Sequence, residues 1–258
     1  MTATQQPRVT VITGSASGMG LEISRTLATP EHTLVLVDRD AAVHDVASEL
    51  SGRAAGAASY ITDLSDPEQV LELTRRITAE HGGVDILVNN AGIHPKRQDG
   101  SHFPIPEIDL DQWRLVFDVN VTAVFLLSQW ALASMTPRGW GRIVNIASRA
   151  GRMYSSVAGA QYAASKAAVI GFTRNLAGEA GPHGITANTV APGRVKTPLS
   201  DIGGESGDLD LHGMFADMVP VGRIGRPEEI AAVVEFLVSE KSSFLTGAVL
   251  DVNGGVFG

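Results

Sequence analysis

A glycine-rich turn near the start of the chain constrains its fold more than any other feature. The β-branched residues 9–13 predict a short strand, which stops at Gly14, Gly18 and Gly20, and a helical pattern follows over residues 21–28. A strand, a glycine turn and a helix in this order present backbone N–H groups and a positive helix end to a pyrophosphate, whereas a side chain would block that approach. Because a glycine-rich turn alone is a weak signal, an ordinary turn is the alternative.

An acidic residue at the end of the next predicted strand strengthens the nucleotide interpretation. Residues 33–37 form an apolar β-branched run that ends in Asp38. In a dinucleotide-binding fold, an acid here accepts hydrogen bonds from the adenosine ribose and repels a 2′-phosphate. The sequence therefore favours NAD over NADP. Arg39 could pair with a phosphate, but Asp38 would oppose it and the glycine turn adds no second basic residue.

The remaining chain alternates between strand-like and helix-like patterns. Further strands are expected at residues 57–62, 86–89, 142–147, 186–190 and 248–252, with helices at 41–50, 67–81, 110–135, about 160–180 and 227–237. Right-handed crossovers between such strands predict an α/β fold: a single-domain, Rossmann-type, doubly wound parallel sheet of about seven strands with helices on both faces. We expect one domain over residues 1–258. Residues 199–219 break every periodic pattern, which is typical of an active-site lid or a disordered loop, and we expect a substrate lid there.

Three polar side chains suggest chemistry on an alcohol or a carbonyl. Tyr162 and Lys166 are four residues apart in a predicted helix, which puts the phenol and the ammonium on one face. A nearby cation favours the phenolate, so we expect Lys166 to lower the pKa of Tyr162. Ser148 ends the strand at residues 142–147, where its hydroxyl could hold the reacting oxygen. The alternative is a helix with a core tyrosine and a solvated lysine.

Several short motifs then agree in order and spacing with one family: Thr13-Gly14-(x)3-Gly18-x-Gly20, Asp63-Leu64, Asn89-Asn90-Ala91-Gly92, Asn120, Ser148, Tyr162-(x)3-Lys166 and Pro192-Gly193. Over nearly its whole length the chain resembles the short-chain dehydrogenase/reductase family, in its branch of about 250 residues. The resemblance implies hydride transfer between a secondary alcohol or its ketone and a nicotinamide cofactor, NAD.

The resemblance also assigns roles to individual residues. It implies that Tyr162 is the general acid/base, that Lys166 lowers its pKa and binds the nicotinamide ribose, that Ser148 orients the substrate oxygen, and that Asn120 anchors a proton-relay water. The residues expected around the dinucleotide are Gly14, Ser17, Gly18, Met19, Gly20, Asp38, Asp63, Leu64, Asn90, Ala91, Gly92, Tyr162, Lys166, Pro192, Gly193, Val195 and Thr197.

Basic residues around Ser148 depart from the pattern that the resemblance leads us to expect. Arg149 and Arg152 follow the serine, and Arg194 and Lys196 lie next to Pro192-Gly193. Together they predict recognition of a substrate carboxylate or phosphate, and the alternative is that they pair with surface acids. His94, Lys96, Arg97 and His102, in the loop-like residues 93–108, either contact the substrate or form a solvated face.

Composition excludes several other classes of function. The net charge of −8 argues against a nucleic-acid-binding face, and the lack of cysteine excludes disulfides and thiolate sites. The seven histidines show no metal-binding spacing, so no metal is expected. The first residues lack the pattern of a signal peptide, and no uninterrupted apolar run approaches about 18 residues, so the sequence predicts a cytoplasmic protein without membrane contact.

Three functions remain open at this stage. The first is an NAD-dependent oxidoreductase acting on a small secondary alcohol or ketone, with a sugar acid or hydroxy acid favoured. The second is an enzyme like the 3-oxoacyl-carrier-protein reductases, and the third is a non-catalytic, NAD-binding regulatory protein. The family resemblance further implies a homotetramer that assembles through the helices at residues 110–135 and 162–180 and through the C-terminal strand.

Overall fold

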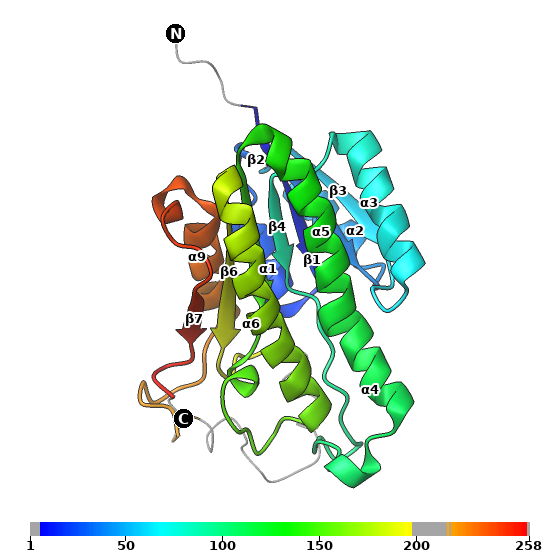
Figure 1. The fold of residues 1–258 in the computed structure, drawn as a ribbon, viewed down its shortest axis with the longest axis vertical. Helices are drawn as coiled ribbons and strands as arrows, with labels where there is room; N and C mark the ends of the chain where they lie inside the picture. The colour runs from blue at the N-terminus through cyan, green and yellow to red at the C-terminus, as the bar shows by residue number, and fades with distance from the viewer. Residues whose placement is uncertain (1–5, 198–215, 217, 257–258) are drawn as a thin grey trace.

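A seven-stranded, all-parallel sheet forms the centre of the molecule, as the sequence predicted (Figure 1). The computed structural model describes residues 6–197, 216 and 218–256. In spatial order the strands are β3 (Gly56–Ile61), β2 (His32–Asp38), β1 (Arg8–Thr13), β4 (Ile86–Asn89), β5 (Gly141–Ile146), β6 (Ile185–Pro192) and β7 (Val249–Val252). The chain winds outward from β1 to β3 and then places β4 on the other side of β1. The loops after β1 and β4 therefore diverge, which opens a ligand site at the carboxyl edge of the sheet.

Helices cover both faces of the sheet (Figure 1). Helices α1 (Gly18–Thr26), α2 (Val43–Leu50) and α9 (Pro227–Val238) share one buried cluster with the sheet, and α3 (Pro67–His81), α5 (Ala123–Met135) and α6 (Ala160–Ala180) share the other. Alternate strand residues serve opposite clusters, as when Ile12 packs in the first and Val11 in the second. Because both faces are buried, the central strands carry apolar residues at consecutive positions, as at residues 34–37 of β2.

Local signals in the sequence set the bounds of the helices. Helix α3 begins as predicted, with the Asp66 side chain accepting from the Glu68 and Gln69 N–H groups and Pro67 at the first helical position. It ends at Gly82, whose φ of 77° lies in the left-handed region that favours glycine.

The helix predicted over residues 110–135 is interrupted. The structure has α4 (Leu110–Phe117), then a π-helical turn (Asp118–Thr122), then α5. The prediction of one regular helix was wrong because the wider turn places the Asn120 side chain, which is fully buried, against the backbone of Ile93. The apolar periodicity of the sequence continues through the turn and does not reveal it.

Helix α5 is unusually apolar. In the part of the chain that the structure describes, the helical run Leu110–Arg138 is the one that by length and composition could cross a membrane, with a mean hydropathy of 1.6. Core helices pass the same test, and α5 contributes Leu127, Ala131 and Met135 to the cluster that it shares with α3 and the sheet.

The predicted substrate lid cannot be compared with the structure. Of residues 199–219, only 216, 218 and 219 belong to the described part of the chain.

Candidate active site

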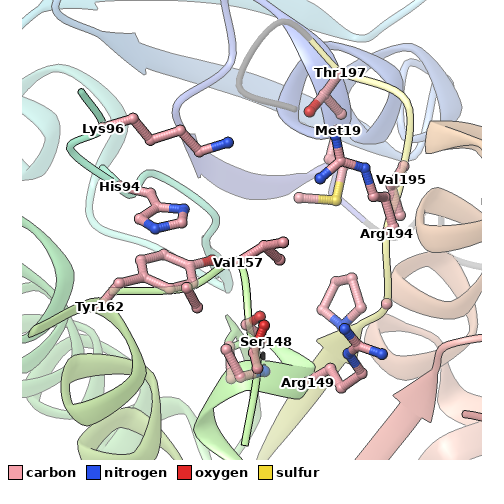
Figure 2. A pocket seen from close by; sticks show the side chains of 16 residues that line it. Met19, His94, Lys96, Ser148, Arg149, Val157, Tyr162, Arg194, Val195 and Thr197 are labelled. Carbon is pink, nitrogen blue, oxygen red and sulfur yellow. Dashed lines mark hydrogen bonds between the residues drawn. The ribbon is translucent and has the colours of Figure 1, made fainter. Parts of the chain in front are cut away.

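A cavity of about 130 Å³ opens at the carboxyl edge of the sheet. Its wall is built from Met19 on α1, the segment after β4, the end of β5 with the loop that follows, Tyr162 on α6, and residues 192–195 and 197 after β6 (Figure 2). These segments are far apart in the sequence and meet because parallel strands end at one edge. The predicted residues Met19, Ser148, Tyr162, Pro192, Gly193, Val195 and Thr197 all line this cavity.

The glycine turn has the shape of a phosphate cradle. Gly14 and Gly18 have φ values of 67° and 57°, and a Cβ built on Gly20 would lie 1.9 Å from the Gly14 carbonyl oxygen. At the start of α1, the N-cap Ser17 makes no side-chain capping hydrogen bond, and the first turn contains no acidic residue. The helix therefore presents its positive end without a competing negative charge, which suits a pyrophosphate.

Asp38 lies beside this turn at the end of β2. One carboxylate oxygen accepts from the Ala16 N–H at 2.9 Å and the other accepts from the Asp40 N–H at 3.0 Å. These two hydrogen bonds fix the carboxylate at the end of β2, and its contact with an adenosine ribose stays a prediction.

The ends of β1 and β4 are joined by side-chain hydrogen bonds. Thr13 Oγ1 accepts from the Asn90 and Ala91 N–H groups, both at 3.1 Å, and Asn90 Nδ2 donates to the carbonyls of Thr13 and Gly14 at 2.9 and 3.1 Å. Asn90 Oδ1 is buried and has no hydrogen-bond partner among the described residues. An unpaired buried oxygen beside an uncapped helix end fits a dinucleotide that completes the site.

Other predicted cofactor residues follow the carboxyl ends of β3 and β4. Leu64 is buried after β3, where the Asp63 carboxylate accepts from the N–H and the hydroxyl of Ser65. A Cβ on Gly92 would lie 3.0 Å from Lys166 Nζ and 3.2 Å from Asn120 Oδ1, so glycine suits the close approach of these side chains.

The Lys166 side chain is buried in the site and is held there by a hydrogen bond from its ammonium group. The side chain is 4% exposed, Nζ donates to the Ile146 carbonyl at 2.9 Å, and Nζ lies 5.8 Å from the centre of the Tyr162 ring. Burial lowers the pKa of Lys166 to about 8, which keeps most of the amine protonated at neutral pH.

The expectation that Lys166 lowers the pKa of Tyr162 is not met in this structure. Burial raises the pKa of Tyr162, and the hydrogen bond with Ser148 acts in the opposite direction without reversing the shift. The physical reason is that partial burial disfavours the charged phenolate, while the Lys166 ammonium donates to the Ile146 carbonyl.

Ser148 is hydrogen-bonded with Tyr162, and Asn120 lies between the segment after β4 and α6. Ser148 Oγ also accepts from the Ala150 N–H at 3.1 Å. Asn120 Oδ1 accepts from the Ile93 N–H at 2.8 Å, and its Nδ2 donates to the Ile93 carbonyl and to Ser165 Oγ, both at 3.0 Å. Asn120 thus clamps the segment after β4 against α6, and its role in a proton relay stays a prediction.

Two residues that the sequence left undecided belong to the cavity. His94 stacks on Tyr162 with ring centres 4.3 Å apart and an interplanar angle of 20°, and Lys96 lies beside it (Figure 2). Burial, with smaller contributions from Lys96 and His102, lowers the pKa of His94 to about 4. Their position directly after a strand that ends at the sheet edge was the available signal, but the loop has no periodicity that predicts which side chains turn inward.

The basic residues predicted around Ser148 divide into two groups. Arg149 and Arg194 line the cavity with Lys96, whose pKa is lowered by burial and by Arg194. Arg152 does not line it and instead pairs with Asp251 on β7 at 2.5 Å. The described lining contains three cationic side chains and no aspartate or glutamate, although the chain as a whole carries a net charge of −8.

Comparison with known proteins agrees with this geometry. Residues 14–257 match the Enoyl-(Acyl carrier protein) reductase family. The cis-4-hydroxycyclohexanecarboxylate dehydrogenase of Sinomonas cyclohexanicum is 39% identical, over 96% of both chains.

Solved structures of similar proteins have the same fold. An NAD-bound 3-oxoacyl-[acyl-carrier protein] reductase from Brucella melitensis has a TM-score of 0.85 and 35% identity, over 99% of this chain and 93% of the other. A protein from Beutenbergia cavernae, described as an NAD(P)-dependent gluconate 5-dehydrogenase and holding NADP at low occupancy, has a TM-score of 0.86 and 34% identity, over 96% of both chains.

The chain belongs to the short-chain dehydrogenase/reductase family. It is therefore an oxidoreductase of CH–OH groups that uses a nicotinamide cofactor.

Proposed function

We propose that this chain is an NAD-dependent dehydrogenase of a small secondary alcohol that carries a carboxylate, such as a sugar acid or a hydroxy acid. The observation that carries the proposal is the cavity lining, where Lys96 and Arg149 lie with Ser148 and Tyr162, and where the described lining residues include no aspartate or glutamate. A half-buried cation such as Lys96 is stabilised by an anion beside it, and a substrate carboxylate would supply that charge.

The choice of NAD rests on Asp38. Its carboxylate is fixed beside the glycine turn by the Ala16 and Asp40 N–H groups. A 2′-phosphate bound at the end of β2 would face this negative charge, whereas a ribose hydroxyl would donate to it.

In the proposed reaction the hydride and the proton of the alcohol go to different acceptors. The nicotinamide, when bound, accepts or returns the hydride. In the oxidative direction Tyr162 takes the hydroxyl proton as the carbinol becomes a carbonyl, and Ser148 holds the substrate oxygen by a hydrogen bond. Lys166 is predominantly charged at neutral pH and stabilises the phenolate once substrate and cofactor exclude water from the site.

The similar proteins support the carboxylate. The relative from Sinomonas cyclohexanicum is named for a hydroxy acid, and the structure from Beutenbergia cavernae is described by gluconate, a sugar acid. We extend only the shared chemistry to this chain: a hydroxyl to be oxidised and a carboxylate elsewhere on the same small molecule.

The test compares pairs of substrates by nicotinamide absorbance, first with NAD and then with NADP. Each pair has the same carbinol and differs in whether a carboxylate or its primary amide is present. We expect turnover with NAD and a clear preference for the acid. Arg149→Ala should raise the KM for the acid far more than for the amide, while the matched control Arg152→Ala, which removes an arginine paired with Asp251, should affect both substrates little. Equal effects of Arg149→Ala on acid and amide would refute carboxylate recognition.

The alternative functions are separated by the same assay. The similarity to the Brucella melitensis reductase supports the second hypothesis, a carrier-protein reductase. Faster reduction of a 3-oxoacyl thioester than of any small oxo acid would favour that hypothesis. Binding of NAD without turnover of any alcohol would favour the regulatory reading.

A cytoplasmic homotetramer is the proposed physiological form. Exposed apolar side chains on α4 and α5, namely Leu110, Trp113, Leu115 and Phe125, support assembly through these helices. Sedimentation of the purified chain as a monomer would refute the oligomer.

A further inference from the structure

The ring of His94 covers one face of the Tyr162 ring. The centres lie 4.3 Å apart and the planes differ by 20°, so the two rings are in stacking contact. Figure 2 shows the His94 imidazole above the Tyr162 phenol, with the Lys96 side chain above the imidazole. The phenol therefore cannot tilt toward the segment after β4 while this imidazole is in place.

A hydrogen bond fixes the orientation of the imidazole. The Gly159 N–H donates to His94 Nε2 at 3.3 Å, so Nε2 is the unprotonated nitrogen and the neutral ring carries its proton on Nδ1. Gly159 is the N-cap residue of α6, three positions before Tyr162. His94 thus contacts both the tyrosine ring and the start of the helix that carries it.

The backbone that carries His94 is itself anchored. Asn120, in the π-helical turn, accepts from the Ile93 N–H and donates to the Ile93 carbonyl, and it also donates to Ser165 Oγ. Ser165 Oγ in turn donates to the Tyr162 carbonyl at 2.8 Å. A closed path of contacts therefore runs from the π-helical turn through residues 93 and 94 to both the ring and the backbone of Tyr162.

We propose that His94 is a positioning residue that, as a neutral flat ring, holds the Tyr162 phenol in its reactive orientation. This inference rests on the proposed role of Tyr162 as general acid/base and goes beyond it, because the role of His94 is steric and requires no proton transfer by the imidazole. A flat apolar ring should therefore replace it, whereas a smaller side chain should not.

The groups around the two rings are consistent with a neutral imidazole. Lys96 and His102 face His94, Lys166 and Ser148 face Tyr162, and Arg149 and Arg194 lie across the cavity. An additional positive charge at His94 would be repelled by Lys96 and His102.

The first test measures catalysis by three variants. We expect His94→Ala to lower kcat by about 10- to 100-fold, as a displaced reacting group does, with the Kd of NAD unchanged. His94→Phe keeps a flat ring over the phenol and should retain kcat within about threefold of wild type. His94→Leu fills the volume without a flat ring and should resemble His94→Ala, so it replaces that variant if His94→Ala does not fold.

The second test is independent of turnover, which separates this inference from the proposed function. The chain has three tyrosines, so the phenolate absorbance of each protein minus that of the same protein carrying Tyr162→Phe reports Tyr162 alone. Opening the stack lets water reach the phenol and should lower the pKa of Tyr162 in His94→Ala, whereas His94→Phe should leave it at the wild-type value.

The outcomes are distinct. Loss of kcat in His94→Phe equal to that in His94→Ala would mean that an imidazole nitrogen is required, and it would overturn the steric role. Full kcat with an unchanged pKa of Tyr162 in both variants would overturn positioning altogether. Absence of turnover in the wild type, combined with a shifted pKa of Tyr162 in His94→Ala alone, would reject the proposed function and retain the contact.

Discussion

Replacing Lys166 with methionine should stabilise the folded protein while abolishing turnover. In the structure the ammonium is 4% exposed, and burial lowers its pKa from 10.5 to about 8. At about 1.36 kcal/mol for each pKa unit, a charged Lys166 at pH 7 costs the fold about 3 kcal/mol. Loss of the hydrogen bond from Nζ to the Ile146 carbonyl destabilises the variant by about 1 kcal/mol. The free energy of unfolding should therefore rise by about 2 kcal/mol in net. For a chain of this size, the thermal midpoint should rise by about 4–8 °C.

The pH dependence distinguishes charge burial from better packing. Because the folded pKa of Lys166 is lower than its unfolded value, the wild type loses stability as pH falls from 10.5 to about 8, and below 8 the loss is complete. The advantage of Lys166→Met should therefore be complete at pH 7 and nearly absent at about pH 10.5.

The assay is denaturant unfolding of wild type and variant across this pH range, without added nicotinamide. Lys241→Met is the matched control, because Lys241 is exposed and its replacement should change stability little at any pH. A gain from Lys166→Met that is the same at pH 7 and at pH 10.5 would show that packing, and not the buried charge, is responsible.

Three further predictions concern other parts of the site. Asp38→Ser should raise kcat/KM for NADP relative to NAD by at least about tenfold, since the opposing carboxylate is gone; unchanged preference in coenzyme kinetics would contradict the role of Asp38. Lys96→Met should raise the KM for an acid substrate by about tenfold and leave the KM for its amide unchanged, and an equal rise for both would remove Lys96 from carboxylate binding. The pKa of His94 is about 4 in the folded protein and 6.5 in the unfolded chain. The contribution of His94 to stability is therefore complete above pH 6.5, decreases as pH falls below 6.5, and is lost as pH falls through 4. Between pH 6.5 and pH 5, His94→Phe should therefore lose about 1–2 kcal/mol less stability than wild type, and parallel unfolding curves would refute this.

The sequence predicts most of the fold because its strong signals are local. β-Branched runs mark the strands, Asp66 and Pro67 mark the start of α3, and the edge rule for parallel sheets brings Ser148 and Tyr162 to one cavity. These features depend on neighbouring residues or on the order of elements, and both can be recognised from the sequence alone.

The features that were missed depend on partners distant in the sequence. The π-helical turn follows from the contact between Asn120 and Ile93, and the inward direction of His94 follows from Tyr162 and Gly159. Arg152 was grouped with the substrate arginines, but Asp251 lies 99 positions away, and no local pattern could have paired them.

The late position of Asp251 in the chain bears on how the protein is made. Asp251 belongs to β7, which pairs with the end of β6 at Pro192, next to the cavity wall at Gly193. The backbone of Gly193 also donates to Val252, so that wall is held by residues that are synthesised after almost every other part of the cavity. A growing polypeptide can place its glycine turn and its tyrosine helix early, yet the wall facing them gains its support only when β7 has left the ribosome.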